Sequence, residues 1–292
     1  MNDKQVTFGI ITPSYAPDFE RCKLLCESVD KFISPAVKHY LIVDRRDLQL
    51  FRQLENSHTE LLAVEDILPW WIQRVPFLKK AWLSLKTMPL RNWLVQQIVK
   101  IATGQEIAED VAVFVDSDVV FVRPFDFQTF VRDDGKVRFY REPKGNEIQK
   151  KVHLKWHQSA SNLLGLPDVD LTIPDYIGNA ITWKKENVVK LCKHLESVSG
   201  RGWIETLANT YNLSEYVLYG IFVERILQSE SGHYNRAENL CNDYWYPEAL
   251  DDEKLSQLIK ETAPEQVALM ITAKAGMPVE RYKPLLEKEF SF

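Results

Sequence analysis

Two aspartates interrupt an apolar stretch of the chain in a way that suits metal chemistry. The sequence VFVDSDVVFVRPF covers residues 113–125 and places Asp116 and Asp118 one residue apart between two apolar runs. A carboxylate in apolar surroundings is costly unless a cation compensates its charge. Carboxylate oxygens are ligands that Mg²⁺ and Mn²⁺ prefer, and these ions often complete their shell with water and substrate phosphates. The pair therefore predicts a Mn²⁺ or Mg²⁺ site for a phosphorylated substrate, with two solvated turn or helix-capping aspartates as the alternative.

Strands and helices alternate in the chain before the aspartate pair. Residues 6–12 are rich in β-branched side chains and end at Pro13. Residues 19–32 carry apolar side chains at helical spacing, and residues 40–43 form a second apolar run that ends at Asp44. The order strand, helix, strand is typical of a parallel sheet.

Three further elements lead up to the aspartates. A third strand is expected within LLAVEDIL at 61–68, and WLVQQIVKIA at 93–102 predicts a helix that Gly104 stops. The apolar run at 111–115 predicts the strand that ends at Asp116. This alternation favours an α/β fold of the Rossmann-like kind, with a mainly parallel mixed sheet flanked by helices. In such a sheet, ligands bind at the carboxyl ends of the strands.

The second half of the chain is richer in tryptophan and tyrosine and has fewer clear strands. Helical spacing predicts two helices there, at 185–198 and 214–228. No internal repeat or flexible linker is visible. We therefore expect a single compact unit over residues 1–292, with a nucleotide-binding half at 1–128 and an acceptor-binding half with a C-terminal tail at 129–292.

Composition and charge narrow the classes of partner. The chain has 292 residues, of which 45% are hydrophobic and 26% charged, as is typical of a globular protein with a sizeable core. Its net charge of −5 argues against broad nucleic-acid binding. The sequence lacks the patterns of a signal peptide and of a transmembrane segment, and its four cysteines form neither a disulfide framework nor a zinc pattern. We expect a cytoplasmic protein, and peripheral membrane contact is left open.

Six segments in order carry a resemblance to a known group of enzymes. They are FGIITPSYAPDFERCKLLCESV, HYLIVDRRD, NWLVQQIVKIA, the DSD segment, DYIGNAITWKKENV and SEYVLYG, and together they span most of the chain. The DSD segment resembles the DxD signature of nucleotide-sugar-dependent glycosyltransferases of the GT-A fold. The combination more closely resembles a group of uncharacterised bacterial glycosyltransferase-like proteins.

This resemblance implies a GT-A-like fold and a metal-dependent glycosyltransferase of the hexosyltransferase type. The donor would be a nucleoside-diphosphate sugar, with UDP as the leading nucleotide, and the acceptor a glycan or a small hydroxyl compound. Nine residues are implied to contact the donor: Thr12, Pro13, Ser14, Tyr15, Asp44, Gln97, Lys100, Asp116 and Ser117. Lys100 and Gln97 share a helix face, so Lys100 could meet the diphosphate, although an ordinary solvated lysine is the alternative.

The same resemblance suggests how the metal would be held. Asp118 would bind the ion directly, and Asp116 would contact the ion, its water shell or the ribose. Relatives often add a late histidine, for which His233 is the candidate, although a histidine in a polar loop needs no such role. In the tail segment where relatives place a closing ligand, this sequence offers Thr272, Ala273 and Lys274 instead of a histidine.

Two acidic residues of the second half are candidates for catalysis. Asp175 and Asn179 flank an apolar segment that Gly178 lets bend, and we expect this loop to line the acceptor pocket together with Trp156 or Trp183. A buried strand with polar ends is the alternative. Glu215 begins the helix expected at 214–228, where it could act on the acceptor hydroxyl or the donor sugar. The alternative is that Ser214 or its neighbour caps this helix and that Glu215 is a first-turn glutamate favoured by the helix dipole, without any part in catalysis.

Two other classes of protein compete with this reading. DSDVV also fits the nucleophile motif of haloacid-dehalogenase-like phosphatases, but that motif normally opens the first strand of its chain, whereas about 110 residues precede it here. A non-catalytic carbohydrate-binding protein is the second rival, because the eight tryptophans suit sugar stacking as well as a core.

Overall fold

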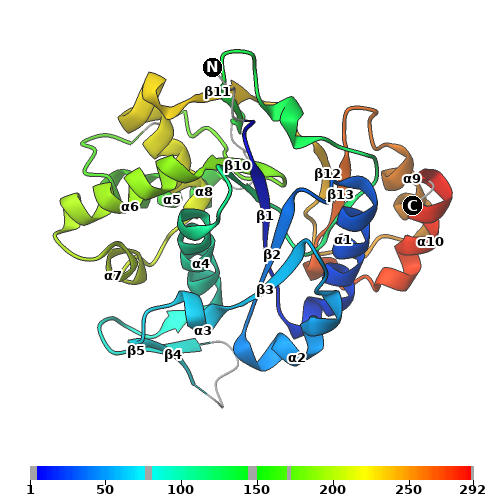
Figure 1. The fold of residues 1–292 in the computed structure, drawn as a ribbon, viewed down its shortest axis with the longest axis horizontal. Coiled ribbons are helices and arrows are strands. Elements are labelled where there is room, and N and C mark those ends of the chain that lie inside the picture. Colours follow the sequence, from blue (N-terminus) through cyan, green and yellow to red (C-terminus); the bar gives the residue numbers. More distant parts are fainter. Residues whose placement is uncertain (1–4, 76–80, 144–149, 170–171, 291–292) are drawn as a thin grey trace.

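A five-stranded sheet forms the centre of the molecule (Figure 1). The computed structural model describes residues 5–75, 81–143, 150–169 and 172–290. In spatial order the sheet contains β10 (Ile181–Lys184), β7 (Val111–Phe114), β1 (Phe8–Pro13), β2 (Lys38–Val43) and β3 (Thr59–Ala63). Only β10 runs antiparallel to its neighbour, so the predicted mainly parallel α/β sheet is confirmed.

The inner strands are apolar because helices cover both of their faces. All the residues of β1 and β7 are buried, as expected for strands inside a parallel sheet. In the register, Ile11 lies beside Phe114 and Thr12 beside Leu41. The carboxyl ends of β1, β2 and β7 therefore meet at one edge of the sheet, where Pro13, Asp44 and Asp116 follow.

The long helices divide between the two faces of the sheet. On one side lie α1 (Phe19–Phe32), α9 (Asp252–Lys260) and α10 (Val279–Phe290) (Figure 1). On the other side lie α4 (Asn92–Glu106), α5 (Lys150–Leu163), α6 (Lys185–Ser199), α7 (Trp203–Ala208) and α8 (Glu215–Ile221). The helices predicted at 19–32, 185–198 and 214–228 are confirmed, the last continuing from α8 as a π-helix over Phe222–Leu227.

Two details of the predicted elements are wrong. Gly104 does not stop α4, which continues to Glu106. Gly104 is buried, and an added Cβ would lie 3.5 Å from the Phe114 ring, an ordinary contact distance, so the packing at this position does not require a glycine. The segment LLAVEDIL is strand only as far as Ala63, because α3 (Val64–Ile67) follows β3 directly. A short helix α2 (Leu48–Phe51) lies between β2 and β3.

Three small sheets complete the molecule. One has the order β12 (Cys241–Tyr244), β13 (Ala268–Ile271) and β8 (Val119–Phe121). Its strand β8 begins directly after the aspartate pair. The second joins β9 (Val137–Tyr140) to β11 (His233–Arg236). The third is the antiparallel sheet of β4 (Ile72–Arg74), β5 (Ala81–Ser84) and β6 (Leu90–Arg91) at the periphery (Figure 1). Within the described ranges, no helix is both long and apolar enough to cross a membrane.

Candidate active site

The aspartate pair lies in the loop between β7 and β8. Asp116 and Asp118 are both partly buried there. Asp118 Oδ2 accepts a hydrogen bond of 2.8 Å from the backbone N–H of Ala273, which follows β13. Burial raises the pKa of Asp118 to about 7, and the negative charge of Asp116 adds to this shift. The tail segment singled out from the sequence thus contacts the aspartate loop, but through its backbone.

A buried lysine joins the aspartate loop to α8. Lys100 Nζ lies 3.2 Å from Asp116 Oδ1 and 3.2 Å from Glu215 Oε1, and it donates a 3.1 Å hydrogen bond to the hydroxyl of Tyr216. Gln97, one helical turn earlier, accepts a hydrogen bond of 3.0 Å from the backbone N–H of Glu215. Four residues singled out from the sequence are therefore brought together from α4, the β7–β8 loop and α8.

The electrostatics of this cluster hold the lysine in its charged form. Lys100 is only 4% exposed, and burial by itself would lower its pKa. Asp116, Tyr216 and Glu215 together outweigh that effect and raise the pKa of Lys100 well above its ordinary value. Lys100 is thus not an ordinary solvated lysine, and its charge is shared between two carboxylates that belong to different segments.

Glu215 does not act as the cap of its helix. Ser214 caps α8, because its hydroxyl accepts a hydrogen bond from the backbone N–H of Val217. The side chain of Glu215 is buried and points to Lys100. Glu215 follows this cap in the first turn of α8, where the helix dipole favours a carboxylate, so that alternative remains open beside a catalytic role, which stays a prediction.

A third carboxylate of this region was missed in the sequence. Asp243, on β12, accepts hydrogen bonds from the side-chain amides of Asn179 at 3.0 Å and Asn239 at 2.6 Å. Asn179 in turn accepts a 3.4 Å hydrogen bond from the backbone N–H of Asp116. Burial raises the pKa of Asp243, and the charge of Asp116 contributes. The pairing of β12 with β13 and of β13 with β8 brings this residue to the site, and no local pattern in NDYW reveals that pairing.

A cleft of about 900 Å³ opens at the carboxyl ends of β1 and β2 and reaches the aspartate loop. Five of the residues expected to contact the donor line it: Pro13, Ser14, Tyr15, Asp44 and Ser117. Tyr15 is 47% exposed, so its ring is free to meet a ligand. Arg46 and Arg91 supply positive charge to the walls.

Other residues expected to contact the donor lie behind the cleft wall. Thr12 is fully buried, and its hydroxyl lies 3.0 Å from Nε2 of His39. Gln97 faces Glu215, so the side chains that α4 gives to the cleft are those of its neighbours, including Gln96. Thr12 and Gln97 do not line the cleft, because the strand and the helix turn these two side chains inward, and their contact with a donor stays a prediction.

Asp44 is held by two arginines at the end of β2. Its Oδ2 lies 2.9 Å from Arg46 and 3.1 Å from Arg74. Burial raises the pKa of Asp44, while the two guanidinium groups oppose that shift. The carboxylate is thus fixed at the cleft wall, where its free oxygen edge can meet a ribose or base.

The late histidine lies apart from the aspartate loop. On β11, His233 Nε2 is 2.8 Å from the hydroxyl of Tyr219, and Nδ1 is 3.1 Å from the carbonyl of Val137. Burial lowers the pKa of His233 to about 4. Both ring nitrogens are engaged, so His233 is not arranged as a metal ligand here. Among the described residues, no group of three or more His, Cys, Asp and Glu side chains is placed to hold a metal ion.

The acceptor side differs from the expectation in two residues. Trp183 is fully buried and stacks on Tyr219 with ring centres 4.5 Å apart, so it belongs to the core and does not line a pocket. Gly178 does not have a positive φ; the left-handed residue of this segment is Ala180, at φ 58°. Trp156 is partly buried and stacks on Trp93, a residue of the cleft wall.

Asp175 is a fixed residue of a neighbouring loop. Its side chain accepts a 3.0 Å hydrogen bond from the backbone N–H of Ile177, and His153 Nδ1 lies 3.9 Å away. Burial raises the pKa of Asp175. The structure gives it no contact with the Lys100 cluster, and its catalytic role stays a prediction.

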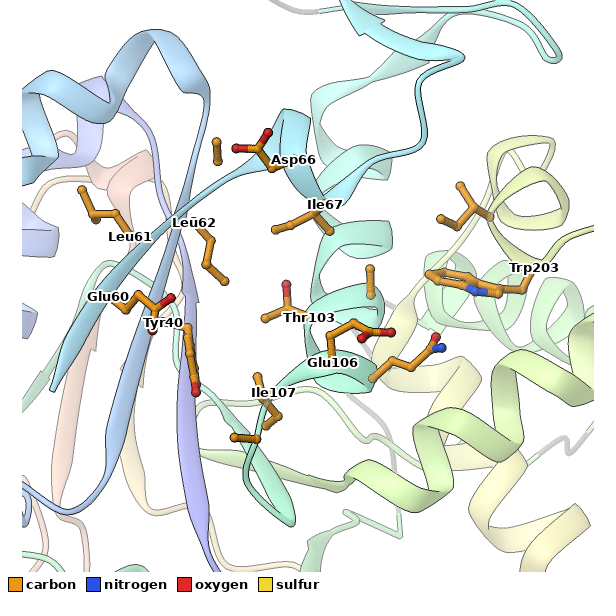
Figure 2. A pocket seen from close by; sticks show the side chains of 15 residues that line it. Tyr40, Glu60, Leu61, Leu62, Asp66, Ile67, Thr103, Glu106, Ile107 and Trp203 are labelled. Atoms are coloured by element: carbon orange, nitrogen blue, oxygen red, sulfur yellow. The ribbon is translucent and has the colours of Figure 1, made fainter.

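A second cavity, of about 690 Å³, lies away from the aspartate loop, between β3 and the C-terminal half of α4 (Figure 2). Glu60, Asp66 and Glu106 line it, and none of its described lining residues is a lysine or arginine. Such a site repels a diphosphate. The cleft beside the aspartate loop also has three carboxylates in its lining, those of Asp18, Asp44 and Asp47, but its two arginines make it the better candidate for a nucleotide.

Fold and site together define an α/β protein with a cleft and an acidic loop at the carboxyl edge of its parallel sheet. The chain belongs to DUF6492, a family of unknown function, whose sequence profile matches residues 7–264. Curated proteins give no significant match to this sequence.

One solved structure shows the same general fold, and a second aligns more weakly. The apo structure of the bifunctional glycosyltransferase WbbM aligns with a TM-score of 0.51 at 10% identity, covering 93% of this chain and 47% of that one. The present chain thus spans about half the length of that relative. Apo mouse xyloside xylosyltransferase 1 aligns with a TM-score of 0.47 at 9% identity, covering 94% of this chain and 100% of that one. At 10% identity the similarity to WbbM concerns the fold alone.

Proposed function

We propose that this protein is a glycosyltransferase that moves a sugar from a nucleoside-diphosphate sugar, first of all a UDP-sugar, to a hydroxyl acceptor. The observation that carries the proposal is the meeting of the aspartate loop with a buried Lys100–Glu215 pair at the end of a nucleotide-sized cleft. The fold likeness to WbbM, whose structure is named a bifunctional glycosyltransferase, agrees with it.

The cleft offers a place for each part of the donor. Tyr15 can stack on the base, and Asp44 can accept a hydrogen bond from the base or ribose. The diphosphate would then lie toward Ser117, with positive charge from Arg46 along the wall. This order places the sugar close to Asp116 and the Lys100 cluster.

A Mn²⁺ or Mg²⁺ ion fits the donor atoms of the loop. Asp116 and Asp118 present hard carboxylate oxygens, and within the described part of the chain Asp118 forms no ion pair. These two residues would hold the ion, while Asp243 and Asn179 anchor the loop from behind. When bound, such an ion neutralises charge on a departing diphosphate.

Glu215 is the residue of this site that we assign to the reacting sugar. In an inverting reaction its carboxylate could take the proton of the acceptor hydroxyl, and in a retaining one it could stabilise positive charge on the sugar. Lys100 keeps Glu215 and Asp116 in place and is a positioning residue. The acceptor is a glycan or another hydroxyl compound, with Asp175 on the neighbouring loop as a further candidate contact.

A panel of nucleotides and sugars tests this assignment. Thermal unfolding is followed with UDP, GDP and their common sugar conjugates, each with and without Mn²⁺, and donor hydrolysis is followed for those that stabilise the protein. Stabilisation by a nucleoside diphosphate only with metal supports the proposal. Hydrolysis of an aryl phosphate would instead favour the phosphatase, and stabilisation by glycan alone would favour a carbohydrate-binding protein.

A further inference from the structure

The small peripheral sheet of β4, β5 and β6 carries an unusual amount of exposed apolar surface. The four most exposed large apolar side chains of the described residues are Met88 at 79%, Trp70 and Tyr211 at 73%, and Leu85 at 61%. Three of them lie within or beside this sheet, and Leu83 on β5 adds a fifth exposed side chain at 44%. Isolated exposed apolar residues are normal, but a cluster of this kind marks an interaction surface.

The strand pairing explains why these side chains face outward. Along β5, Trp82 and Ser84 are buried, whereas Leu83 and the following Leu85 are exposed, as the alternation of a strand requires. Leu85 donates its backbone N–H to the carbonyl of Trp71, which keeps this outward face beside Trp70. The sheet projects from the body of the molecule below α3 and α4 (Figure 1).

Tyr211 is fixed to the same surface by an arginine. The guanidinium of Arg91, on β6, lies 4.3 Å from the centre of the Tyr211 ring and donates a 3.2 Å hydrogen bond to the Tyr211 carbonyl. The loop before α8 is thus held against β6. We call the set of Trp70, Leu83, Leu85, Lys86, Met88, Arg91 and Tyr211 the hairpin surface.

The charge of this segment is opposite to that of the protein. The hairpin surface carries two basic side chains, Lys86 and Arg91, and no acidic one, although the whole chain carries a net charge of −5. Lys86 stands between Leu85 and Met88, and it also reaches Glu205 at 3.6 Å. Apolar and aromatic side chains beside basic ones, without acids among them, suit an anionic lipid surface, because rings enter the interface while cations meet the headgroups.

We propose that the hairpin surface docks on a membrane that contains anionic lipid. Trp, Tyr, Met and Leu side chains would enter the headgroup region, and Lys86 and Arg91 would meet lipid phosphates. The contact is peripheral and reversible, because it uses the tips of a small sheet.

Docking in this way has a consequence for the acceptor, and this step rests on the proposed function. Arg91, on β6, belongs to the hairpin surface and also lines the cleft, as does the neighbouring Trp93 at the start of α4. The mouth of the cleft on this side therefore lies near the lipid headgroups. An acceptor that enters there is an amphiphile, with its hydroxyl group at headgroup level and its apolar part in the membrane.

Co-sedimentation with vesicles tests the docking directly, without donor or metal. The protein is mixed with vesicles of phosphatidylcholine alone or with added phosphatidylglycerol. We expect binding to the anionic vesicles that weakens with salt and falls roughly tenfold or more in the double variant Trp70→Ser with Leu85→Ser. Lys86→Glu should weaken binding to anionic vesicles while leaving the thermal unfolding temperature near that of the wild type.

A control variant and a measurement of the oligomeric state distinguish membrane docking from other uses of this surface. Leu50→Ser with Val198→Ser removes two exposed apolar side chains elsewhere and should bind vesicles as the wild type does. Absence of vesicle binding, or binding that the Trp70 and Leu85 changes leave intact, overturns the proposal. A dimer in size-exclusion chromatography that this double variant dissociates also overturns it, by assigning the surface to a second copy. Metal-dependent UDP binding without vesicle binding would refute only the docking. Vesicle binding without metal-dependent UDP binding would refute only the proposed function.

Discussion

Lys100 Nζ lies 3.2 Å from Glu215 Oε1 and equally close to Asp116 Oδ1, so one buried cation links the start of α8 to the loop after β7. A buried charge without a partner would be costly, but here the lysine and the two carboxylates neutralise one another. Because the lysine comes from α4, a helix of the cleft wall, the contact also ties the site to the nucleotide-sized cleft. The proposed active site depends on this contact between Lys100, Glu215 and Asp116.

Removal of the lysine should be strongly destabilising. In Lys100→Met the buried Glu215 and the partly buried Asp116 keep their charges without a cation, and we expect the free energy of unfolding in urea to fall by roughly 3 kcal/mol. The double variant with Glu215→Gln should recover part of that loss. Lys190→Met, which changes an exposed lysine of α6, serves as the control and should stay within about 0.5 kcal/mol of the wild type. A loss no larger than in the control would show that the pair is not buried in solution.

Replacement of Glu215 by glutamine separates catalysis from helix capping. If Glu215 acts on the sugar or the acceptor, Glu215→Gln should bind nucleotide normally and transfer sugar on the order of a hundredfold more slowly. Ser214→Ala is the control, since it removes the actual cap and should cost about 1 kcal/mol of stability with turnover nearly intact. Near-normal turnover in Glu215→Gln would remove this residue from the reacting centre.

Asn179 should position the aspartate loop through two hydrogen bonds. Asn179→Ala leaves Asp243 without one of its donors and Asp116 without a backbone contact, so we expect a stability loss of about 1–3 kcal/mol. Affinity for nucleotide with Mn²⁺ should fall about tenfold as the loop loosens. Asn209→Ala, at an exposed position of the chain, should change neither quantity. Unchanged nucleotide affinity in Asn179→Ala would disconnect Asp243 from the site.

Buried His39 predicts how stability depends on pH. Burial lowers the pKa of His39 to about 3, with the nearby His58 adding to the shift, whereas the unfolded chain has its ordinary value near 6.5. The unfolded state therefore binds the proton first, and the contribution of His39 to stability is full above about pH 6.5 and declines as the pH falls toward 3. We expect its share of the slope to be roughly 1 kcal/mol per pH unit between about pH 6 and about pH 4. His39→Gln should flatten the slope by this amount in urea unfolding at several pH values, and an unchanged slope would contradict the prediction.

The sequence allowed much of the fold to be predicted because its strands and helices have strong local patterns. The apolar runs at β1, β2 and β7 and the spacing in α1 and α6 leave little choice of element. The predicted stop at Gly104 was wrong because a glycine inside a helix costs only about 1 kcal/mol relative to alanine, which the burial of α4 outweighs. The predicted parallel arrangement of these strands also placed Pro13, Asp44 and Asp116 at one edge of the sheet.

The site was predictable only where sheet order or helical spacing brings residues together. Lys100 and Glu215 were singled out separately, and their contact depends on how α4 and α8 pack. Asp243 reaches the aspartate loop through the pairing of β12 with β13, which no local pattern encodes. Trp183 was expected to line the acceptor pocket but lies in the core. A tryptophan suits sugar stacking and a core equally well, and the sequence does not reveal which of the two applies until its burial is known.

Titration calorimetry of UDP with Mn²⁺ tests the central claim most directly. The account predicts that the wild-type protein binds UDP with Mn²⁺ and loses measurable binding when the metal is chelated. Asp118→Asn should abolish the metal-dependent binding and leave the unfolding transition cooperative, while Asp134→Asn, in an exposed turn, should bind as the wild type does. Equal UDP affinity in wild type and Asp118→Asn, with or without metal, would contradict the account.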